Sequence, residues 1–188
     1  MIDVGTKRLE TDRLILRRLE LDDAEAMFNG WCNDFEVARY LPWDPHWKIE
    51  VTNELLEMWV NDYNNSHTYR WIVVLKNENR PIGTIDVVNK DINNSIFEVG
   101  YCYSKDSWGK GIGSEALNCV VSYLFDEVGV DVITAKHIEN NPASGRVMQK
   151  AGMKKDGFLR SRVIDKITKE RVGLVVYSIT RDEYLGTK

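Results

Sequence analysis

Three short runs of β-branched and aromatic residues follow one another closely in the middle of the chain. They cover residues 69–75, 81–88 and 96–103, and two polar segments, residues 76–80 and 89–94, connect them. Connections this short suit hairpins but cannot hold the helical crossover that parallel strands require. We therefore predict three antiparallel strands, which excludes a sheet built wholly from β-α-β units.

Helix and strand patterns flank these three strands. Before them we predict a strand at residues 14–19, a helix from Asp22 or Asp23 to about residue 32, and a helix over residues 51–62. After them we predict helices at residues 113–128 and 143–151, and strands at residues 130–135, 153–164 and 172–180. The expected fold is of the α/β (α+β) class, with a mixed, mostly antiparallel sheet flanked by helices. Because the sequence has no internal repeat or linker, we expect a single domain over residues 1–188.

Composition and charge are typical of a soluble globular protein. The 188 residues are 43% hydrophobic and 29% charged, with a net charge of −4, so no global attraction draws the chain to nucleic acid or to an anionic membrane. Cys32, Cys102 and Cys119 form no CxxC pair, and the three histidines have no metal-ligand spacing. We expect neither a metal site nor a disulfide, and a cytoplasmic protein with reduced thiols.

Three glycines alternate between the third of these strands and the next predicted helix, at Gly109, Gly111 and Gly113. Glycine allows a close backbone approach to a ligand and a positive φ. The start of the helix adds unpaired N–H groups and the positive end of the helix dipole. The segment therefore predicts an anion site suited to a diphosphate.

Two other interpretations compete for this segment. One is a tight turn without a ligand. The other is a dinucleotide-binding loop, because Gly111, Gly113 and Ala116 satisfy G-x-G-x-x-A and Glu139 follows the next strand. That fingerprint requires repeated β-α-β units, which the antiparallel strands disfavour, so a nucleotide-dependent oxidoreductase is nearly excluded.

Two segments resemble the acyl-CoA-binding motifs of the GCN5-related N-acetyltransferases (GNAT). Residues 108–113, Trp-Gly-Lys-Gly-Ile-Gly, resemble Q/R-x-x-G-x-G/A, with Trp108 in place of Gln or Arg. Residues 141–153 are similar to the second motif, N-x-x-S-x-x-x-x-x-K-x-G-F. Residues 9–17, together with Glu98-Val-Gly-Tyr101, resemble the RimJ/RimL branch of ribosomal-protein N-terminal acetyltransferases. The likeness extends over nearly the whole chain.

The resemblance implies a GNAT-like fold whose strand ending at Tyr103 splays from the strand at residues 132–135, so that acetyl-CoA enters the gap. Pantetheine would pair with the backbone of Tyr101, Cys102 and Tyr103, and Asn141 and Ser144 would also contact the cosubstrate. The residues implied for the pyrophosphate are Trp108, Gly109, Lys110, Gly111, Ile112, Gly113 and Ser114. For Asn141, a helix N-cap before Pro142 is a second interpretation that is compatible with the first.

The expected chemistry is direct attack of a neutral amine on the thioester. Glu98 is the candidate general base, directly or through a water, and a salt-bridged strand glutamate is an equal alternative. Ser144 is one candidate for returning a proton to the leaving thiolate, beside water and, as a weaker candidate, Tyr177, because Met148 replaces a tyrosine acid common in the family. A covalent intermediate on Cys102 is disfavoured, since no histidine stands near it in the sequence and direct transfer is the family rule.

The amine acceptor is expected at residues 40–47 and the helix that follows. Tyr40, Trp43 and Trp47 are predicted to form an aromatic wall, and Asp44 and Asp86, with Glu98, to attract a cationic amine. The predicted function is an acetyl-CoA-dependent N-acetyltransferase without a metal, acting as a monomer or a homodimer on a protein N-terminal amine or a small-molecule amine. The alternative is a non-catalytic acyl-CoA-binding or sensing domain.

Overall fold

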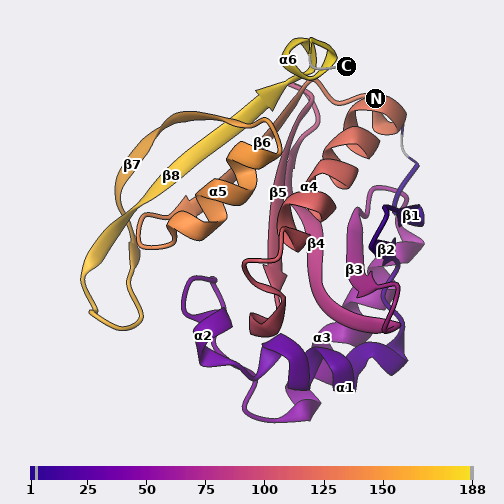
Figure 1. Cartoon of the computed structure of the whole chain (residues 1–188), viewed down its shortest axis with the longest axis vertical. Helices are drawn as coiled ribbons and strands as arrows, with labels where there is room; N and C mark the ends of the chain where they lie inside the picture. The colour runs from indigo at the N-terminus through magenta and orange to yellow at the C-terminus, as the bar shows by residue number, and fades with distance from the viewer. Residues whose placement is uncertain (3, 187–188) are drawn as a thin grey trace.

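One twisted sheet runs through the molecule and carries helices on both faces (Figure 1). The computed structural model describes residues 1–2 and 4–186, and over these residues the strand order is β1-β2-β3-β4-β5-β6-β8-β7. The strands are β1 (Leu9–Glu10), β2 (Leu14–Arg17), β3 (Arg70–Leu75), β4 (Arg80–Asp91), β5 (Ile96–Tyr103), β6 (Val132–Ile138), β7 (Lys154–Ile164) and β8 (Arg171–Thr180). The helices are α1 (Ala24–Met27), α2 (Phe35–Ala38), α3 (Ile49–Asn61), α4 (Ile112–Tyr123), α5 (Pro142–Lys150) and α6 (Arg181–Leu185).

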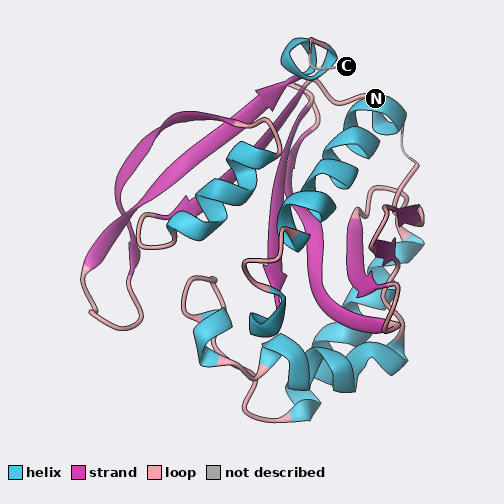
Figure 2. Ribbon diagram, viewed as in Figure 1, coloured by secondary structure: helices cyan, strands magenta, loops and turns pink. Residues whose placement is uncertain are grey.

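The strand pairing divides the sheet into two antiparallel halves. Strands β1 to β5 pair antiparallel in sequence order, and β6, β8 and β7 form a second antiparallel set. The halves meet where β5 pairs with β6 in parallel, through the residue pairs Ile96–Val132, Phe97–Ile133 and Glu98–Thr134. The expected mixed, mostly antiparallel sheet flanked by helices is confirmed (Figure 2).

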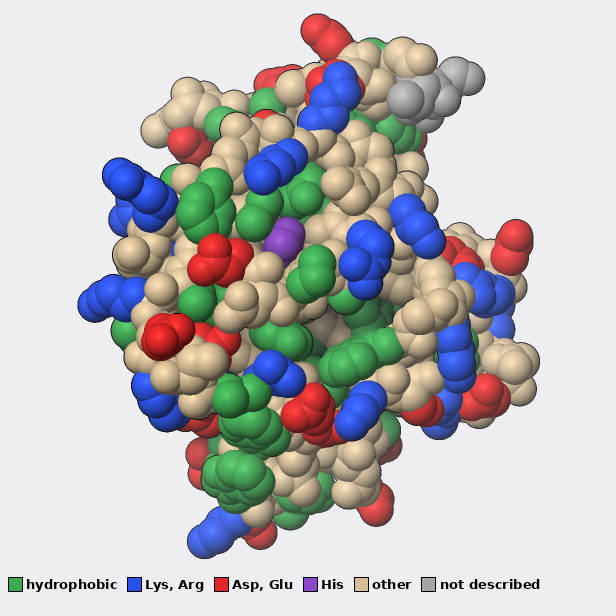
Figure 3. All heavy atoms as spheres, turned by 60° about the vertical axis from the view of Figure 1, so that its left-hand side comes forward, with side chains coloured by type: hydrophobic (Ala, Val, Ile, Leu, Met, Phe, Trp, Pro, Cys, Tyr) green, Lys and Arg blue, Asp and Glu red, His purple; other side chains and the backbone are tan. Residues whose placement is uncertain are grey.

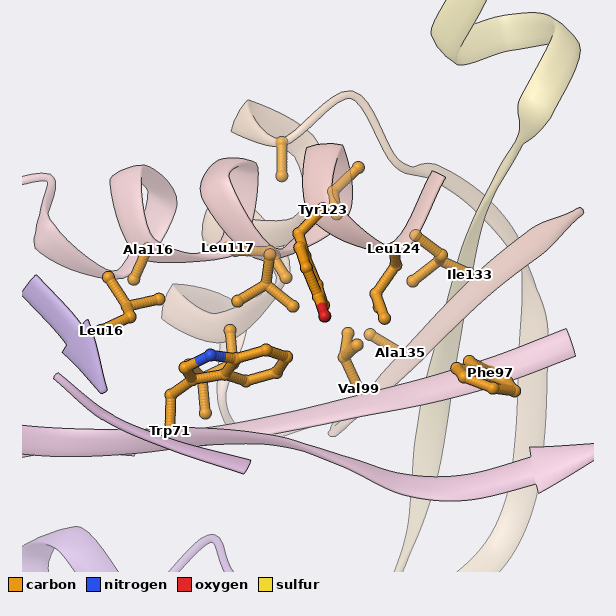
Figure 4. Close-up of a cluster of buried hydrophobic side chains, with 14 of the residues drawn as sticks. Leu16, Trp71, Phe97, Val99, Ala116, Leu117, Tyr123, Leu124, Ile133 and Ala135 are labelled. Atoms are coloured by element: carbon orange, nitrogen blue, oxygen red, sulfur yellow. The ribbon is translucent and has the colours of Figure 1, made fainter. Parts of the chain in front are cut away.

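Two hydrophobic clusters pack on opposite faces of the sheet. The larger one joins α4 and α5 to the sheet, with Trp71 fully buried and in edge contact with Tyr123 (Figure 4). The smaller one joins α1 and α3 to residues such as Ile72 and Val74 of β3. Phe97, Val99, Tyr101 and Tyr103 belong to the first cluster and Cys102 to the second. Because strand side chains alternate, Glu98 and Gly100 also face the α1–α3 side.

The structure differs from the expected elements mainly at their ends. The first predicted helix begins with a 3-10 turn that is capped by Glu20 and Asp23 together, and it ends in a π-helical turn, Phe28–Cys32. Strand β4 continues to Asp91, beyond the predicted end at residue 88. Strand β1 and helices α2 and α6, none longer than five residues, were not predicted, because segments this short carry little periodicity. Among the described residues, the helices are all too short or too polar to span a bilayer.

Candidate active site

A fork opens in the sheet where the pairing between β5 and β6 stops. Beyond Glu98 and Thr134 the two strands have no further paired residues, so residues 99–103 of β5 and 135–138 of β6 form the two arms of the fork. Strand β5 keeps its pairing with β4 along this stretch, from Val87–Val99 to Gly83–Tyr103. Backbone groups on the open edge of β5 are therefore available to an extended ligand. In Figure 3, the surface on the side of β7, β8 and α5 is hollowed near its centre, and hydrophobic side chains surround the opening.

The glycine loop lies at the open end of the fork. Gly109 and Gly111 adopt φ values of +73° and +77°, and Gly111 is the N-cap of α4. The indole N–H of Trp108 donates to the carbonyl oxygen of Tyr103 at 2.9 Å, which fixes the loop to the end of β5. The predicted combination of glycines and a helix N-terminus is thus present, and it directs backbone N–H groups and the positive helix end toward one place.

An arginine that was not predicted holds the loop from its other side. Arg13 donates to the carbonyl oxygen of Lys110 at 3.0 Å and forms an ion pair with Glu115 in the first turn of α4 at 2.5 Å. Thr11 also donates to Glu115. An open groove of about 820 Å³ lies beside these contacts, and its lining includes Thr11, Gly111, Ser114, Asn118 and Lys150. The glycine loop therefore borders an open surface groove.

Three hydroxyl groups lie on the α4–α5 side of the fork. The Tyr101 hydroxyl lies 2.9 Å from the Ser144 hydroxyl and donates to the Ser144 carbonyl at 3.1 Å, so it spans from β5 to α5. Burial raises the pKa of Tyr101 above its ordinary value. The Tyr103 hydroxyl is buried without a partner among the described residues. Its ring lies 3.2 Å from where a Cβ on Gly113 would be. An orphaned buried hydroxyl beside a glycine cradle fits a polar ligand that enters the fork.

Asn141 caps the N-terminus of α5, which is the second of the two roles that the sequence suggested for it. Its side-chain oxygen accepts the backbone N–H of Ser144 at 3.3 Å, and Pro142 occupies the first turn of α5. A contact between Asn141 and a ligand stays a prediction. Ser144 sits in the same first turn, where its hydroxyl reaches Tyr101 across the fork.

Glu98 occupies the last paired position before the fork and carries an ion pair. Lys136 of β6 reaches back to both carboxylate oxygens of Glu98, at 2.8 and 3.2 Å. The Glu98 side chain is 18% exposed and that of Lys136 47%. The salt-bridged glutamate, one of the two sequence interpretations, is therefore observed, while the role of Glu98 as general base stays a prediction.

Asp86 lies on the same face, one strand away. It is paired across the sheet with Gly100 on one side and with Arg70 on the other. The Arg70 guanidinium lies 3.5 Å from Asp86 but 3.0 Å from Asp62 of the turn after α3, and it stacks over the ring of Trp59. Burial raises the pKa of Asp86, and the charge of Arg70 opposes that shift only in part.

The predicted aromatic residues occupy three different surroundings. Trp43 packs against the smaller hydrophobic cluster and contacts the ring of His46, whereas the ring of Tyr40 lies under the Arg39 guanidinium. The side chain of Trp47 is 70% exposed. Among the described residues, the ring contacts of Trp43 and Tyr40 are with His46 and Arg39, and a shared aromatic wall with Trp47 stays a prediction.

Lys166, on the turn between β7 and β8, connects that turn to the aromatic loop, residues 40–47. The ammonium of Lys166 donates to the carbonyl oxygens of Ala38 and Trp43 and pairs with Asp44 at 3.1 Å. Asp165 accepts backbone N–H groups from Ile167 and Thr168, and these bonds hold its pKa at about 2. This contact could not be predicted from local sequence patterns, because its partners lie more than 120 residues apart.

Cys102 and His137 carry chemically reactive groups, but both are held by contacts within the protein. Burial raises the pKa of the Cys102 thiol to about 11, and the thiol lies 3.3 Å from the Thr84 hydroxyl. A thiol is a poor nucleophile under these conditions. The His137 ring is buried, and its Nδ1 lies 2.8 Å from the carbonyl oxygen of Ile138.

Comparison with known proteins gives a consistent result. Residues 13–154 match a family model described as acetyltransferase (GNAT) domain. The chain is 29% identical to the uncharacterized N-acetyltransferase p20 of Bacillus licheniformis, over 95% of this chain and 98% of that protein. It is 34% identical to the uncharacterized N-acetyltransferase YoaA of Bacillus subtilis (strain 168), over 92% of this chain and 96% of that protein.

Solved structures share the fold over nearly the whole chain. An acetyltransferase of the GNAT family from Bacillus anthracis superposes with a TM-score of 0.81 at 26% identity, over 94% of this chain and 99% of that one. The ribosomal-protein-S5-alanine acetyltransferase from Vibrio fischeri has a TM-score of 0.81 at 24% identity, over 94% and 97% of the two chains. The microcin C7 self-immunity acetyltransferase MccE, solved in complex with acetyl-CoA and AMP, has a TM-score of 0.79 at 20% identity, over 90% and 93%.

Proposed function

Since the chain belongs to the acetyltransferase (GNAT) family, we propose that it transfers acetyl directly from acetyl-CoA to a primary amine, with residues 1–188 acting as one catalytic domain. The observation that carries this proposal is the fork between β5 and β6 with the glycine loop at its open end. A fork of this kind offers strand-edge backbone groups to an extended amide chain and an anion site to the pyrophosphate that follows it.

Each segment of the proposed site would bind one segment of acetyl-CoA. The open edge of β5 at Tyr101, Cys102 and Tyr103 would pair with the amides of pantetheine. The loop from Trp108 to Gly113, with Ser114, would hold the pyrophosphate, and the groove that reaches Lys150 would receive the nucleotide end. Asn141 and Ser144 would contact the arm from α5. Acetyl-CoA supplies an activated acetyl group as a thioester.

The proposed transfer exchanges one bond for another. The amine nitrogen forms a bond to the acetyl carbonyl carbon, the carbon–sulfur bond breaks, and the sulfur leaves with its electron pair. The amine proton passes to a carboxylate at the fork. The leaving thiolate takes a proton from water, relayed through the hydroxyl pair of Tyr101 and Ser144, which ends in its starting state. For the carboxylate, the sequence favours Glu98.

The amine is proposed to approach from the α1–α3 side of the sheet. Helices α4 and α5 and the larger hydrophobic cluster fill the opposite side. Asp86 and Glu98 are on the α1–α3 side of the sheet, and Trp43 packs against the hydrophobic cluster on that side. The proposed acceptor site combines them with Tyr40, Asp44 and Trp47. A protein N-terminal amine and a small-molecule amine both satisfy this chemistry, and a curated relative from Escherichia coli, 21% identical, is the [ribosomal protein uS5]-alanine N-acetyltransferase.

The first prediction concerns turnover itself. Release of free thiol from acetyl-CoA, measured across alanine-initiated peptides and polyamines, is expected to depend on added amine and to yield acetylated amine by mass spectrometry. Calorimetry is expected to give a dissociation constant for acetyl-CoA independent of the amine. Tight acetyl-CoA binding with no thiol release for any amine would favour the non-catalytic binding domain instead.

A second prediction addresses the hydroxyl pair. Ser144→Ala is expected to slow thiol release in a single turnover by about 100-fold, because it removes the hydroxyl that relays a proton to the leaving sulfur. The cap of α5 is kept, since it uses the Ser144 backbone N–H. Because Ser144 is also proposed to contact the pantetheine arm, affinity for acetyl-CoA should fall by up to about tenfold, less than the rate.

A matched control for this variant is Ser178→Ala. It removes another serine hydroxyl, one that donates to Asp156 on β7, and should leave the single-turnover rate unchanged. An undiminished rate in Ser144→Ala would remove the hydroxyl pair from the mechanism.

A further inference from the structure

Four charged side chains form a row on the α1–α3 side of the sheet, across the start of the fork. From β3 to β6 they are Arg70, Asp86, Glu98 and Lys136, so that two carboxylates lie inside and two cations outside. Gly100 lies between the two carboxylates: it pairs with Asp86, and it is two residues beyond Glu98 on β5. Asp86 Oδ1 lies 3.9 Å from where a Cβ of Gly100 would be. Both carboxylates therefore border the point where the two arms separate.

The two carboxylates differ in how firmly a cation holds them. Lys136 lies 2.8 and 3.2 Å from the two carboxylate oxygens of Glu98, so a close ion pair occupies both of them. Arg70 lies 3.5 Å from Asp86 through a single nitrogen, since Asp62 and the ring of Trp59 hold the guanidinium in place. Asp86 is therefore the carboxylate that is less closely paired with a cation, so its oxygens are the more accessible to a proton.

The surroundings of Asp86 favour its protonated form. Burial raises its pKa, and Arg70 is the cation that opposes the shift. The other titratable groups that face it are Cys102 of β5 and Tyr63 after α3, whose own pKa values are raised in part by the charge of Asp86. A carboxylate with a raised pKa is better matched to proton abstraction near neutral pH than an ordinary one.

We propose that Asp86 is the general base that takes the proton of the acceptor amine, and that the Glu98–Lys136 ion pair holds the start of the fork at a fixed width. This inference rests on the proposed acetyl transfer and assigns one of its steps. The amine nitrogen loses its proton to Asp86 as its bond to the acetyl carbon forms, and Asp86 later returns that proton to water. Arg70 is a positioning residue, which orients the carboxylate through its contacts with Asp62 and Trp59.

The test compares three isosteric carboxylate variants, Asp86→Asn, Glu98→Gln and Asp91→Asn, with the acceptor that the wild-type protein uses fastest. Asp86→Asn is expected to lower kcat at pH 7 by about 100-fold or more. Its rate should keep rising up to pH 9, because the amine must then lose its proton to solvent, whereas the wild-type rate levels off. Glu98→Gln should keep this levelling and lose less than about tenfold.

Asp91→Asn is the matched control. It changes an aspartate on the same strand as Asp86, at the end of β4, where the carboxylate accepts from Asn94 in the turn before β5, so kcat should stay within about threefold and its pH profile should be unchanged. Calorimetry should give all three variants the wild-type affinity for acetyl-CoA, and thermal unfolding should show that they remain folded.

Each other outcome has a definite meaning. If Asp86→Asn keeps the wild-type rate and pH profile, the assignment of Asp86 is overturned, and a large loss in Glu98→Gln would place the base there. If wild-type protein binds acetyl-CoA but acetylates no amine, the proposed function fails and Asp86 loses its role with it.

Discussion

Gly111→Val is expected to weaken acetyl-CoA binding by more than about 100-fold, as measured by calorimetry. Gly111 has a φ of +77° as the N-cap of α4, a conformation that a β-branched residue avoids. A side chain there would also block the backbone approach to a phosphate and would meet the Arg13 guanidinium, 3.5 Å from the Cβ position. Losing two hydrogen bonds to a charged group, each worth about 1.5–3 kcal/mol, accounts for this magnitude.

The matched control is Gly129→Val. Gly129 has a similar φ of +82° but follows the far end of the α4 segment, after Val128. It should incur a similar conformational cost, of about 1–3 kcal/mol in stability, without affecting affinity for acetyl-CoA. Wild-type affinity in Gly111→Val would mean that the pyrophosphate binds elsewhere.

Gly83→Ala is expected to destabilise the fold by about 3 kcal/mol and to disturb the fork at the same time. A Cβ on Gly83 would lie 2.2 Å from the Cys102 carbonyl oxygen and 2.9 Å from the Tyr103 Cα. Both are backbone atoms, so the end of β5 has to move away from β4. That movement shifts the backbone groups proposed to pair with pantetheine, so urea unfolding and acetyl-CoA binding should both record the change.

Gly157→Ala provides the comparison in another strand. No atom lies within 4 Å of a Cβ at Gly157 of β7, so the variant should be as stable as the wild type or slightly more stable. If Gly83→Ala were equally harmless, the close approach of β4 and β5 would not be needed for the fork.

The sequence predicted the central part of the fold well, for a physical reason. The bounds of β5 were predicted without error, and α4 and α5 were placed to within a few residues, because long apolar patterns and glycine ends mark them strongly. The length of β4 was underestimated, since its last three residues, Asn89, Lys90 and Asp91, are polar, although they pair with Glu98, Phe97 and Ile96 of β5. Its exposed residues have no apolar alternation that a pattern can detect.

The local geometry on the glycine-loop side of the candidate site could be predicted from the sequence, because the residues that form it are close in sequence. The glycine loop and the first turn of α5 are local motifs whose physics does not depend on the rest of the chain. The side-chain contacts on the proposed acceptor side could not be predicted, because they form between elements that are distant in sequence. Arg70 with Asp86, Glu98 with Lys136, and Lys166 with the aromatic loop all depend on strand register or on tertiary packing.

The short parallel junction between β5 and β6 has a consequence for how the protein responds to its substrate. Among the described residues, three residue pairs join the two halves of the sheet, and beyond them the edge of β5 that faces β6 is unpaired. A donor molecule bound in the fork would touch both halves and would serve as a temporary extra strand. At a concentration 100 times its dissociation constant, such a ligand adds about 2.7 kcal/mol to the stability of the folded state. Bound acyl donor would then strengthen the connection between the two halves of the sheet. The protein would resist local opening most when the acyl donor is bound.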